Sequence, residues 1–168
     1  MLLNKRSWYA VYTKPRWEKK VYERLSAAGF EAYCPLNRVK KKWSDRIKWV
    51  EEPLFKSYIF IRITEEEQSG ARMINGVVNF VYWLGKPAVV KDKDIEVIRK
   101  FLNDYHDVQA IPLELKPDEQ IIIQRGAFMN KKARVVKLLN NKVQVIIESL
   151  NYALVAVIDR SNLSQLKK

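Results

Sequence analysis

The sequence predicts an α+β protein in which an antiparallel sheet with packed helices is followed by a small all-β barrel. Two observations separate these parts. Strand-like and helix-like segments are mixed in the first hundred or so residues, whereas about the last fifty contain only short β-type segments. The net charge is +9 over residues 1–102, −4 over 103–119 and +7 over 120–168. We therefore predict domains at 1–105 and 118–168, joined by a linker over 106–117.

The first domain is expected to open with a strand over residues 7–12 and to continue into a helix. Pro15 suits the first turn of this helix, Thr13 is a candidate N-cap, and Gly29 ends the helix. Apolar residues recur at helical spacing and form one stripe: Trp17, Val21, Leu25 and Ala28.

The remaining elements follow from hydrophobic periodicity and turn residues. Residues 31–42 and 46–52 read as a hairpin about residues 43–45, and further strands are expected over 54–63 and 77–84. A helix over 92–103 has acidic residues in its N-terminal half, as the helix dipole favours. The second domain is expected to contain strands over 120–124, 133–139, 142–147 and 152–158.

Composition restricts the function. The 168-residue chain carries a net charge of +12, which is typical of a protein that binds nucleic acid, although a merely basic protein was the alternative. It has one cysteine and one histidine, so we expect no catalytic centre, no metal site and no cofactor. We read no signal peptide and no membrane span, and we expect a cytoplasmic protein without a membrane partner.

The segment over residues 52–62 is the most informative strand, because both of its faces are largely apolar. Alternation places Phe55, Ile59 and Ile61 on one face, and the other carries Leu54, Tyr58 and Phe60. The pattern leaves two interpretations open. This is either a central strand that the chain covers on both faces, or a strand with one aromatic face exposed for a partner protein.

The hairpin over residues 38–49 contains six basic residues and one acidic residue. Alternation separates Arg38, Lys40 and Lys42 from Val39, Lys41 and Trp43. A basic ribbon with an aromatic residue near its tip suits phosphate contact and stacking, which makes Lys40, Lys42, Trp43 and Arg46 candidate nucleic-acid contacts. The alternative is a charged edge that prevents sheet aggregation. Lys14 and Arg16, beside Tyr12, form a smaller basic group.

An ordered set of segments resembles the NusG family of transcription elongation and antitermination factors. The set comprises Trp8-Tyr9, a helix from Arg16, EPLFKSYIFIRI and NGVVNFVYWLGKPAVV, which look like the N-terminal (NGN) domain. The stretch from PDEQIIIQRGAFMNKKARVV onward resembles the KOW domain, an SH3-like barrel. The EPLF block and the scarcity of glycine look closer to the specialised RfaH-like and UpxY-like antiterminators.

This resemblance implies particular sites. Docking on the clamp helices of RNA polymerase would use Leu54, Tyr58, Phe60 and Trp83. Tyr12 and Lys14 match positions that face non-template DNA, with Arg16 as a shifted substitute for a basic residue. In the KOW motif Gly126 and Phe128 match, whereas Ala133 replaces a glycine. Two family contact positions for the ribosome or the Rho factor fall on Lys131 and Leu150.

The resulting hypothesis is a monomeric bacterial antitermination factor without catalytic activity. It would hold the polymerase clamp closed, contact upstream or non-template DNA, and suppress pausing and termination at particular operons. The KOW domain would be a candidate ribosome contact. We expect this domain to be folded as a β-barrel. The main alternative is an RNA- or ribosome-binding KOW protein that does not bind polymerase.

Overall fold

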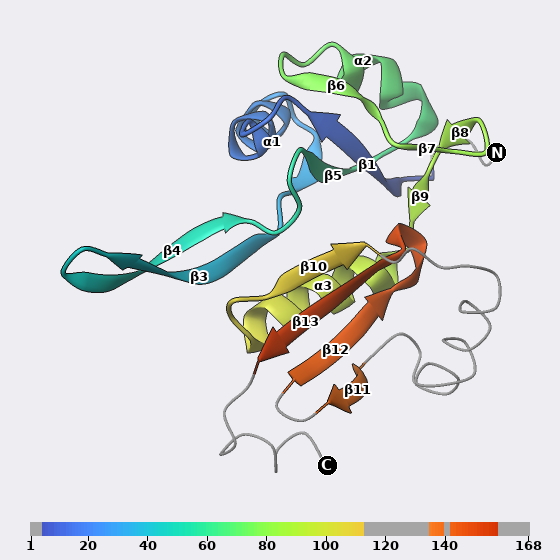
Figure 1. Cartoon of the computed structure of the whole chain (residues 1–168). Helices are drawn as coiled ribbons and strands as arrows, with labels where there is room; N and C mark the ends of the chain where they lie inside the picture. Colours follow the sequence, from blue (N-terminus) through green and yellow to red (C-terminus); the bar gives the residue numbers. More distant parts are fainter. Residues whose placement is uncertain (1–4, 113–134, 140–141, 158–168) are drawn as a thin grey trace. The chain divides into compact units, whose positions relative to one another are not determined.

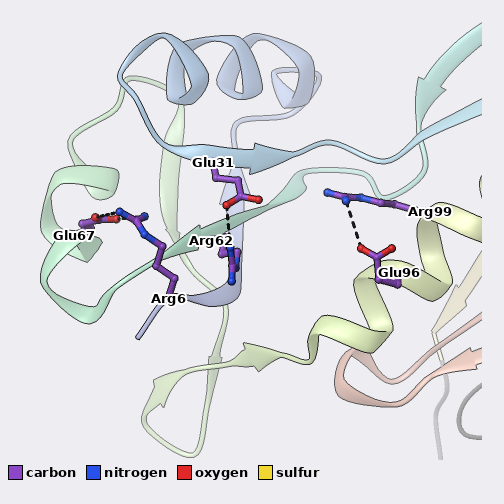
Figure 2. A network of polar contacts seen from close by, with 6 residues as sticks. All are labelled: Arg6, Glu31, Arg62, Glu67, Glu96 and Arg99. Atoms are coloured by element: carbon purple, nitrogen blue, oxygen red, sulfur yellow. Dashed lines mark hydrogen bonds and ion pairs between the residues drawn. The ribbon is translucent and has the colours of Figure 1, made fainter. Parts of the chain in front are cut away.

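The computed structural model describes residues 5–112, 135–139 and 142–157. The chain divides into two compact units, each formed by two segments. The first comprises residues 1–36 and 53–95, and the second comprises residues 37–52 and 96–168. The polar contacts in Figure 2 occur separately within these units.

The first unit contains an antiparallel sheet in the order β2-β5-β1-β6, with β9 also paired to β1 (Figure 1). The pairing register places Tyr12 opposite Tyr58 and Tyr9 opposite Ile61. Because side chains alternate along a strand, this register separates two faces of the sheet. The strands are β1 (Ser7–Thr13), β2 (Glu31–Tyr33), β5 (Tyr58–Ile63), β6 (Val77–Phe80) and β9 (Val89–Val90).

One face of this sheet carries the main apolar core of the first unit. Side chains from β1 and β5 pack there with residues of α1 (Glu18–Ala27) and α2 (Gln68–Arg72). A short 3-10 helix, η1 (Glu65–Glu67), precedes α2. The buried members of this core are Tyr9, Val11, Val21, Leu25, Cys34, Ile59, Ile61, Ile63, Ala71 and Phe80.

The first helix starts later than its sequence predicted. Arg16 has a φ of 66°, in the left-handed region, so the backbone is not yet helical at this position. The Thr13 hydroxyl donates to the Lys14 carbonyl oxygen at 3.0 Å, and the N-cap residue is Trp17, which makes no side-chain cap. The predicted Thr13 cap is therefore wrong. The predicted stop is confirmed, because the helix ends before Gly29, whose φ is 92°.

The predicted strand over residues 77–84 is interrupted. After β6, Val81 donates its backbone N–H to the Ala10 carbonyl oxygen, and β7 (Tyr82–Trp83) then pairs with β8 (Lys86–Pro87). The connecting residues Leu84 and Gly85 have φ values of 52° and 79°. Two consecutive left-handed residues form a tight hairpin turn, which turns the chain away from the main sheet.

Exposed ion pairs add contacts at the surface (Figure 2). Arg6 donates two hydrogen bonds, of 3.0 and 3.2 Å, to Glu67 and joins the segment before β1 to η1. Arg62 on β5 bonds Glu31 on β2 at 3.3 Å. Solvent-exposed pairs of this kind contribute about 0–1 kcal/mol each, so the apolar core dominates the stability of the unit.

The second unit contains a two-stranded hairpin and a four-stranded antiparallel sheet in the order β10-β13-β12-β11 (Figure 1). Cys34 and Pro35 interrupt the strand predicted over 31–42, so that β2 and β3 belong to different sheets. The elements that lie wholly or mostly in this unit are β3 (Leu36–Trp43), β4 (Arg46–Pro53), α3 (Asp92–Asp104), β10 (Gln109–Pro112), β11 (Val135–Leu139), β12 (Lys142–Ile147), η2 (Glu148–Leu150) and β13 (Tyr152–Val157).

The predicted α+β class is confirmed. The helix predicted over 92–103 is observed as α3, and the strands predicted over 142–147 and 152–158 are observed as β12 and β13. Their observed ends differ from the predicted ends by at most one residue. Residues 109–112, inside the predicted linker, form β10 and pair with β13. The strand predicted over 120–124 lies outside the described residues, and the domain limits at 105 and 118 stay a prediction. None of the helices in the described ranges is long and apolar enough to cross a membrane.

Gly76 gives a test of the first core. Its φ is 103°, and an added Cβ would lie 2.6 Å from Val21 Cγ2 and 2.7 Å from Trp17 Cε3. We expect Gly76→Ala to lower the free energy of unfolding by about 2–4 kcal/mol, through overpacking and backbone strain. Gly85→Ala is the control, because φ is 79° there but no atom lies within 4 Å. It should cost about 1 kcal/mol. Equal losses in urea unfolding would contradict this account of the packing.

Candidate functional site

Six aromatic rings form a continuous chain that we call the aromatic face: Trp8, Tyr12, Tyr33, Phe55, Tyr58 and Phe60. The sheet register places its strand residues opposite the main core. Tyr33 stacks on Phe60 with ring centroids 6.3 Å apart, and Tyr12 meets Tyr58 edge-to-face at 6.4 Å. The chain of rings ends at Tyr12, whose side chain is exposed.

The four predicted docking residues differ in exposure. Leu54, Tyr58 and Phe60 are buried, with at most 9% of their surface exposed, whereas Trp83 is 71% exposed. Rings of this chain cover Tyr58 and Phe60: Phe55 lies 4.8 Å from Tyr58 and 5.7 Å from Phe60. Of the four, Trp83 therefore offers the accessible aromatic surface. The docking role of the set stays a prediction.

Phe55 lies on the opposite face from the one that alternation predicted. The regular strand begins only at Tyr58, because Ser57 has a left-handed φ of 70°. The buried Glu18 carboxylate accepts the Ser57 N–H at 2.6 Å, and the Ser57 carbonyl oxygen accepts the Thr13 N–H at 2.8 Å. These two bonds hold the turn that brings Phe55 onto the aromatic face.

The tip of the β7–β8 hairpin is apolar and exposed. Trp83 is 71% exposed and Leu84 is 87% exposed. Tyr82 fixes the base of the tip, because its hydroxyl accepts a 2.6 Å hydrogen bond from Arg72, whose guanidinium also lies over the Phe80 ring. Adjacent apolar side chains at this level of exposure are typical of a protein-docking surface.

The hairpin β3–β4 carries the second candidate surface, and we call residues 38–51 the basic arm. Arg38 and Lys40 both lie 5.3 Å from the centre of the Trp49 ring, and Lys48 lies 5.2 Å from that of Trp43. Arg38 and Lys40 therefore share one side of the hairpin, as the alternation predicts. The arm presents exposed Trp rings beside cations, an arrangement that can stack bases and neutralise phosphates.

A third basic group surrounds Trp17. The cationic groups of Lys14, Lys20 and Arg24 lie 4.8, 4.6 and 5.0 Å from its ring centre. Sequence reasoning had grouped Lys14 with Tyr12 and Arg16, and all three of these side chains are exposed. It had assigned Trp17 only to the apolar stripe of the helix. The cluster adds Lys20 and Arg24 to the positive surface beside β1.

The predicted KOW positions fall mostly outside the described residues. This is so for Gly126, Phe128, Lys131 and Ala133. Leu150, at the end of η2, is half-buried, and Asn151 follows it with a left-handed φ of 58°. The role of this surface stays a prediction.

Cys34 shows no sign of being a reactive nucleophile. Burial, with a smaller contribution from Glu18, raises the pKa of its thiol to about 12, so the thiol is neutral at physiological pH. Among the described residues, no group of three or more His, Cys, Asp and Glu side chains could hold a metal ion.

Sequence reasoning missed the surroundings of His106. Its ring packs edge-to-face on Trp49 with the ring centroids 4.7 Å apart. Sequence reasoning also missed the contributions of Trp8, Tyr33 and Phe55 to the aromatic face. Trp8 and Tyr12 share one face of the first strand, and this spacing is a usable signal for the aromatic face. The His106 contact joins residues 57 positions apart and has no local signal.

Comparison with known proteins identifies the class as a transcription factor. Residues 6–99 match the model of the family described as NusG, transcription termination factor. The transcription termination/antitermination proteins NusG of Streptococcus pyogenes serotype M3 (strain ATCC BAA-595 / MGAS315) and of serotype M1 are each 25% identical over 175 residues. The alignments span 96% of this chain and 97% of each relative.

The family match covers more than half of the chain, and the chain therefore belongs to the NusG family of transcription termination and antitermination factors. A solved structure of Thermotoga maritima NusG, on domain interaction in that protein, has 19% identity and a TM-score of 0.47. It covers 92% of this chain and 98% of its own.

The Glu18 contact can be tested directly. In Glu18→Ala the Ser57 N–H loses its acceptor, and we expect the free energy of unfolding to fall by about 1–3 kcal/mol. Near-UV circular dichroism should change with it, because Phe55 and Tyr58 lose their fixed packing. Glu23→Ala, at an exposed position on the same helix, is the control and should stay within about 0.5 kcal/mol. A silent Glu18→Ala would contradict the role of this turn.

Proposed function

We propose that this NusG-family factor is an antiterminator of the specialised RfaH-like or UpxY-like type that binds the clamp helices of RNA polymerase. The observation that carries the proposal is the exposed apolar tip, Trp83 and Leu84, in the same sheet unit as the aromatic face. The buried Leu54, Tyr58 and Phe60 would form the floor that supports the docking surface. Trp83, with Tyr12 at the accessible end of the aromatic face, would make direct contact.

The mechanism follows from differential binding. A ligand shifts a two-state equilibrium only by the difference between its affinities for the two states. A factor anchored on one wall of the polymerase cleft, with a second contact made only when the clamp is closed, supplies such a difference. A preference of about 1.4 kcal/mol changes the population of the paused, open state about tenfold. This would suppress pausing and termination at particular operons, with the protein acting as a cytoplasmic monomer.

Nucleic-acid contact would come from the basic arm and from the group beside Trp17. Lys40, Lys42, Trp43 and Arg46 would contact upstream DNA, and Tyr12, Lys14 and Arg16 would face the non-template strand. The net charge of +12 supports this division of work: charge steers and strengthens binding near DNA, whereas the aromatic tip gives a specific protein contact.

The docking proposal predicts unequal effects of two exposed tryptophans. We expect Trp83→Ala to weaken binding to RNA polymerase at least tenfold and to reduce terminator read-through, because an exposed aromatic anchor contributes about 2 kcal/mol or more. Trp43→Ala is the matched control, since Trp43 is 51% exposed but lies on the basic arm. It should leave polymerase affinity within about twofold, a loss too small for a hot spot.

Binding titrations with core polymerase and single-round read-through assays would measure both variants. Unchanged polymerase affinity in a folded Trp83→Ala variant would overturn the docking assignment. Tight binding of the wild-type chain to structured RNA or ribosomes, with no affinity for polymerase, would favour the alternative of an RNA- or ribosome-binding KOW protein.

The charge contacts predict a salt dependence. Lys40→Ala/Lys42→Ala should weaken binding to duplex DNA and reduce the slope of log affinity against log salt by about 1–2, because each phosphate contact releases counterions. Lys93→Ala/Lys100→Ala removes the same charge from exposed positions on α3 and should change the slope by less than about 0.5. Equal slopes for the two double variants would show that net charge, not the arm, governs DNA binding.

A further inference from the structure

The base of the basic arm is bonded to the segment that follows α3. Asn37, only 5% exposed, donates its side-chain N–H to the Val108 carbonyl oxygen at 2.7 Å and accepts the Val108 N–H at 3.0 Å. The Asn37 amide thus donates one hydrogen bond to the backbone of Val108 and accepts one from it. Two directly opposed residues in an antiparallel sheet exchange the same pair of hydrogen bonds. The two bonds therefore attach the start of β3 to a residue 71 positions further along the chain.

Asp107 makes two further hydrogen bonds to the backbone of β3. Its N–H donates to the Arg38 carbonyl oxygen at 2.8 Å, and its carboxylate Oδ1 accepts the Lys40 N–H at 3.0 Å. The residue has a φ of 50°, in the left-handed region. That conformation lets the side chain, rather than the next backbone carbonyl, bond Lys40. Asp and Asn tolerate this region better than other non-glycine residues.

A ring contact supports the other strand of the arm. His106 meets Trp49 edge-to-face at 4.7 Å, and its Nδ1 lies 3.2 Å from Asp107 Oδ2. Trp49 is the ring over which Arg38 and Lys40 lie. Residues 106–108 thus contact β3 through hydrogen bonds and β4 through an aromatic ring.

We infer that residues 106–108 and Asn37 form an intramolecular clamp, unrelated to the clamp of RNA polymerase, that sets the direction of the basic arm. Asp107 is a positioning residue for the contact between the arm and DNA. A two-stranded ribbon is marginally stable by itself, so the orientation of its tip depends on what holds its base. The tip residue Trp43 is 51% exposed, and its ring contacts Lys48 of the same arm. The inference rests on the proposed function, which assigns DNA to the arm.

The orientation of the arm can be measured with two nitroxide labels, at Ser44→Cys in the turn of the arm and at Lys100→Cys on α3. Both sites lie in the second compact unit, and Cys34 is buried, so labelling under native conditions is selective. Pulsed electron–electron double resonance measures the distance between the two labels. It should give a narrow distance distribution for the otherwise unchanged chain. Asp107→Ala should broaden it, because Lys40 loses its acceptor and alanine disfavours the left-handed backbone.

Two further substitutions separate the backbone from the hydrogen bond. Asp107→Asn keeps an acceptor and tolerates the left-handed φ, so it should preserve the narrow distribution. Asp107→Gly allows the φ but removes the acceptor, and it should broaden the distribution as Asp107→Ala does. Circular dichroism would establish that each variant is folded. A narrow distribution in folded Asp107→Ala and Asp107→Gly would overturn the clamp.

DNA affinity tests whether the clamp serves binding. Asp107→Ala should weaken duplex binding about 3–10-fold and Asp107→Asn less than twofold, with no added loss when Asp107→Ala is combined with Lys42→Ala/Arg46→Ala. Full additivity, or unchanged affinity in an Asp107→Ala variant with a broadened distribution, would overturn the positioning role. If Lys42→Ala/Arg46→Ala leaves DNA affinity unchanged, the assignment of DNA to the arm fails. The distance distributions still decide whether the clamp sets the direction of the arm.

Discussion

The first unit depends on β5, a strand that is apolar on both faces. Its isoleucines face the helix-covered core, and Tyr58 and Phe60 face the aromatic side. The strand can serve both faces only if it starts at the correct residue, because a shift by one position exchanges the faces. The left-handed Ser57, bonded to Glu18 and Thr13, sets that start. The hydrogen bond from Ser57 to Glu18 of α1 thus helps to decide which side chains of β5 enter the main core and which enter the aromatic face.

The same constraint explains what sequence reasoning could predict. Periodicity identified the faces of residues 58–63, the buried Val21 and Leu25 on α1, and the helix α3, because local spacing encodes them. Ala28, which the same stripe included, is exposed. Periodicity misplaced Phe55, since alternation assumes an extended backbone and Ser57 is not extended. It also extended two strands across Cys34-Pro35 and Val81, where pairing changes partner. The sequence alone does not state which strand pairs with which.

The candidate surfaces show the same limit. The apolar character of Tyr58 and Phe60 was readable, but their burial was not, because the covering ring, Phe55, joins them through a turn with an unexpected conformation. The alternation of the basic arm was readable because it is local. Its attachment was not, because Asn37 and Asp107 act through backbone groups far away in sequence, and a side chain that substitutes for a strand edge leaves no periodic pattern.

Apolar and charged surfaces place different demands on the fold. An apolar tip gains affinity from desolvation at short range, so Trp83 needs a rigid base, which Tyr82 and Arg72 supply through one hydrogen bond. Charges act over a Debye length, which is about 8–10 Å, and tolerate looser placement. A basic ribbon therefore needs a fixed orientation only if its tryptophan rings, and not its charges alone, contact the nucleic acid. The hydrogen-bonded base of the arm is what such a stacking contact requires.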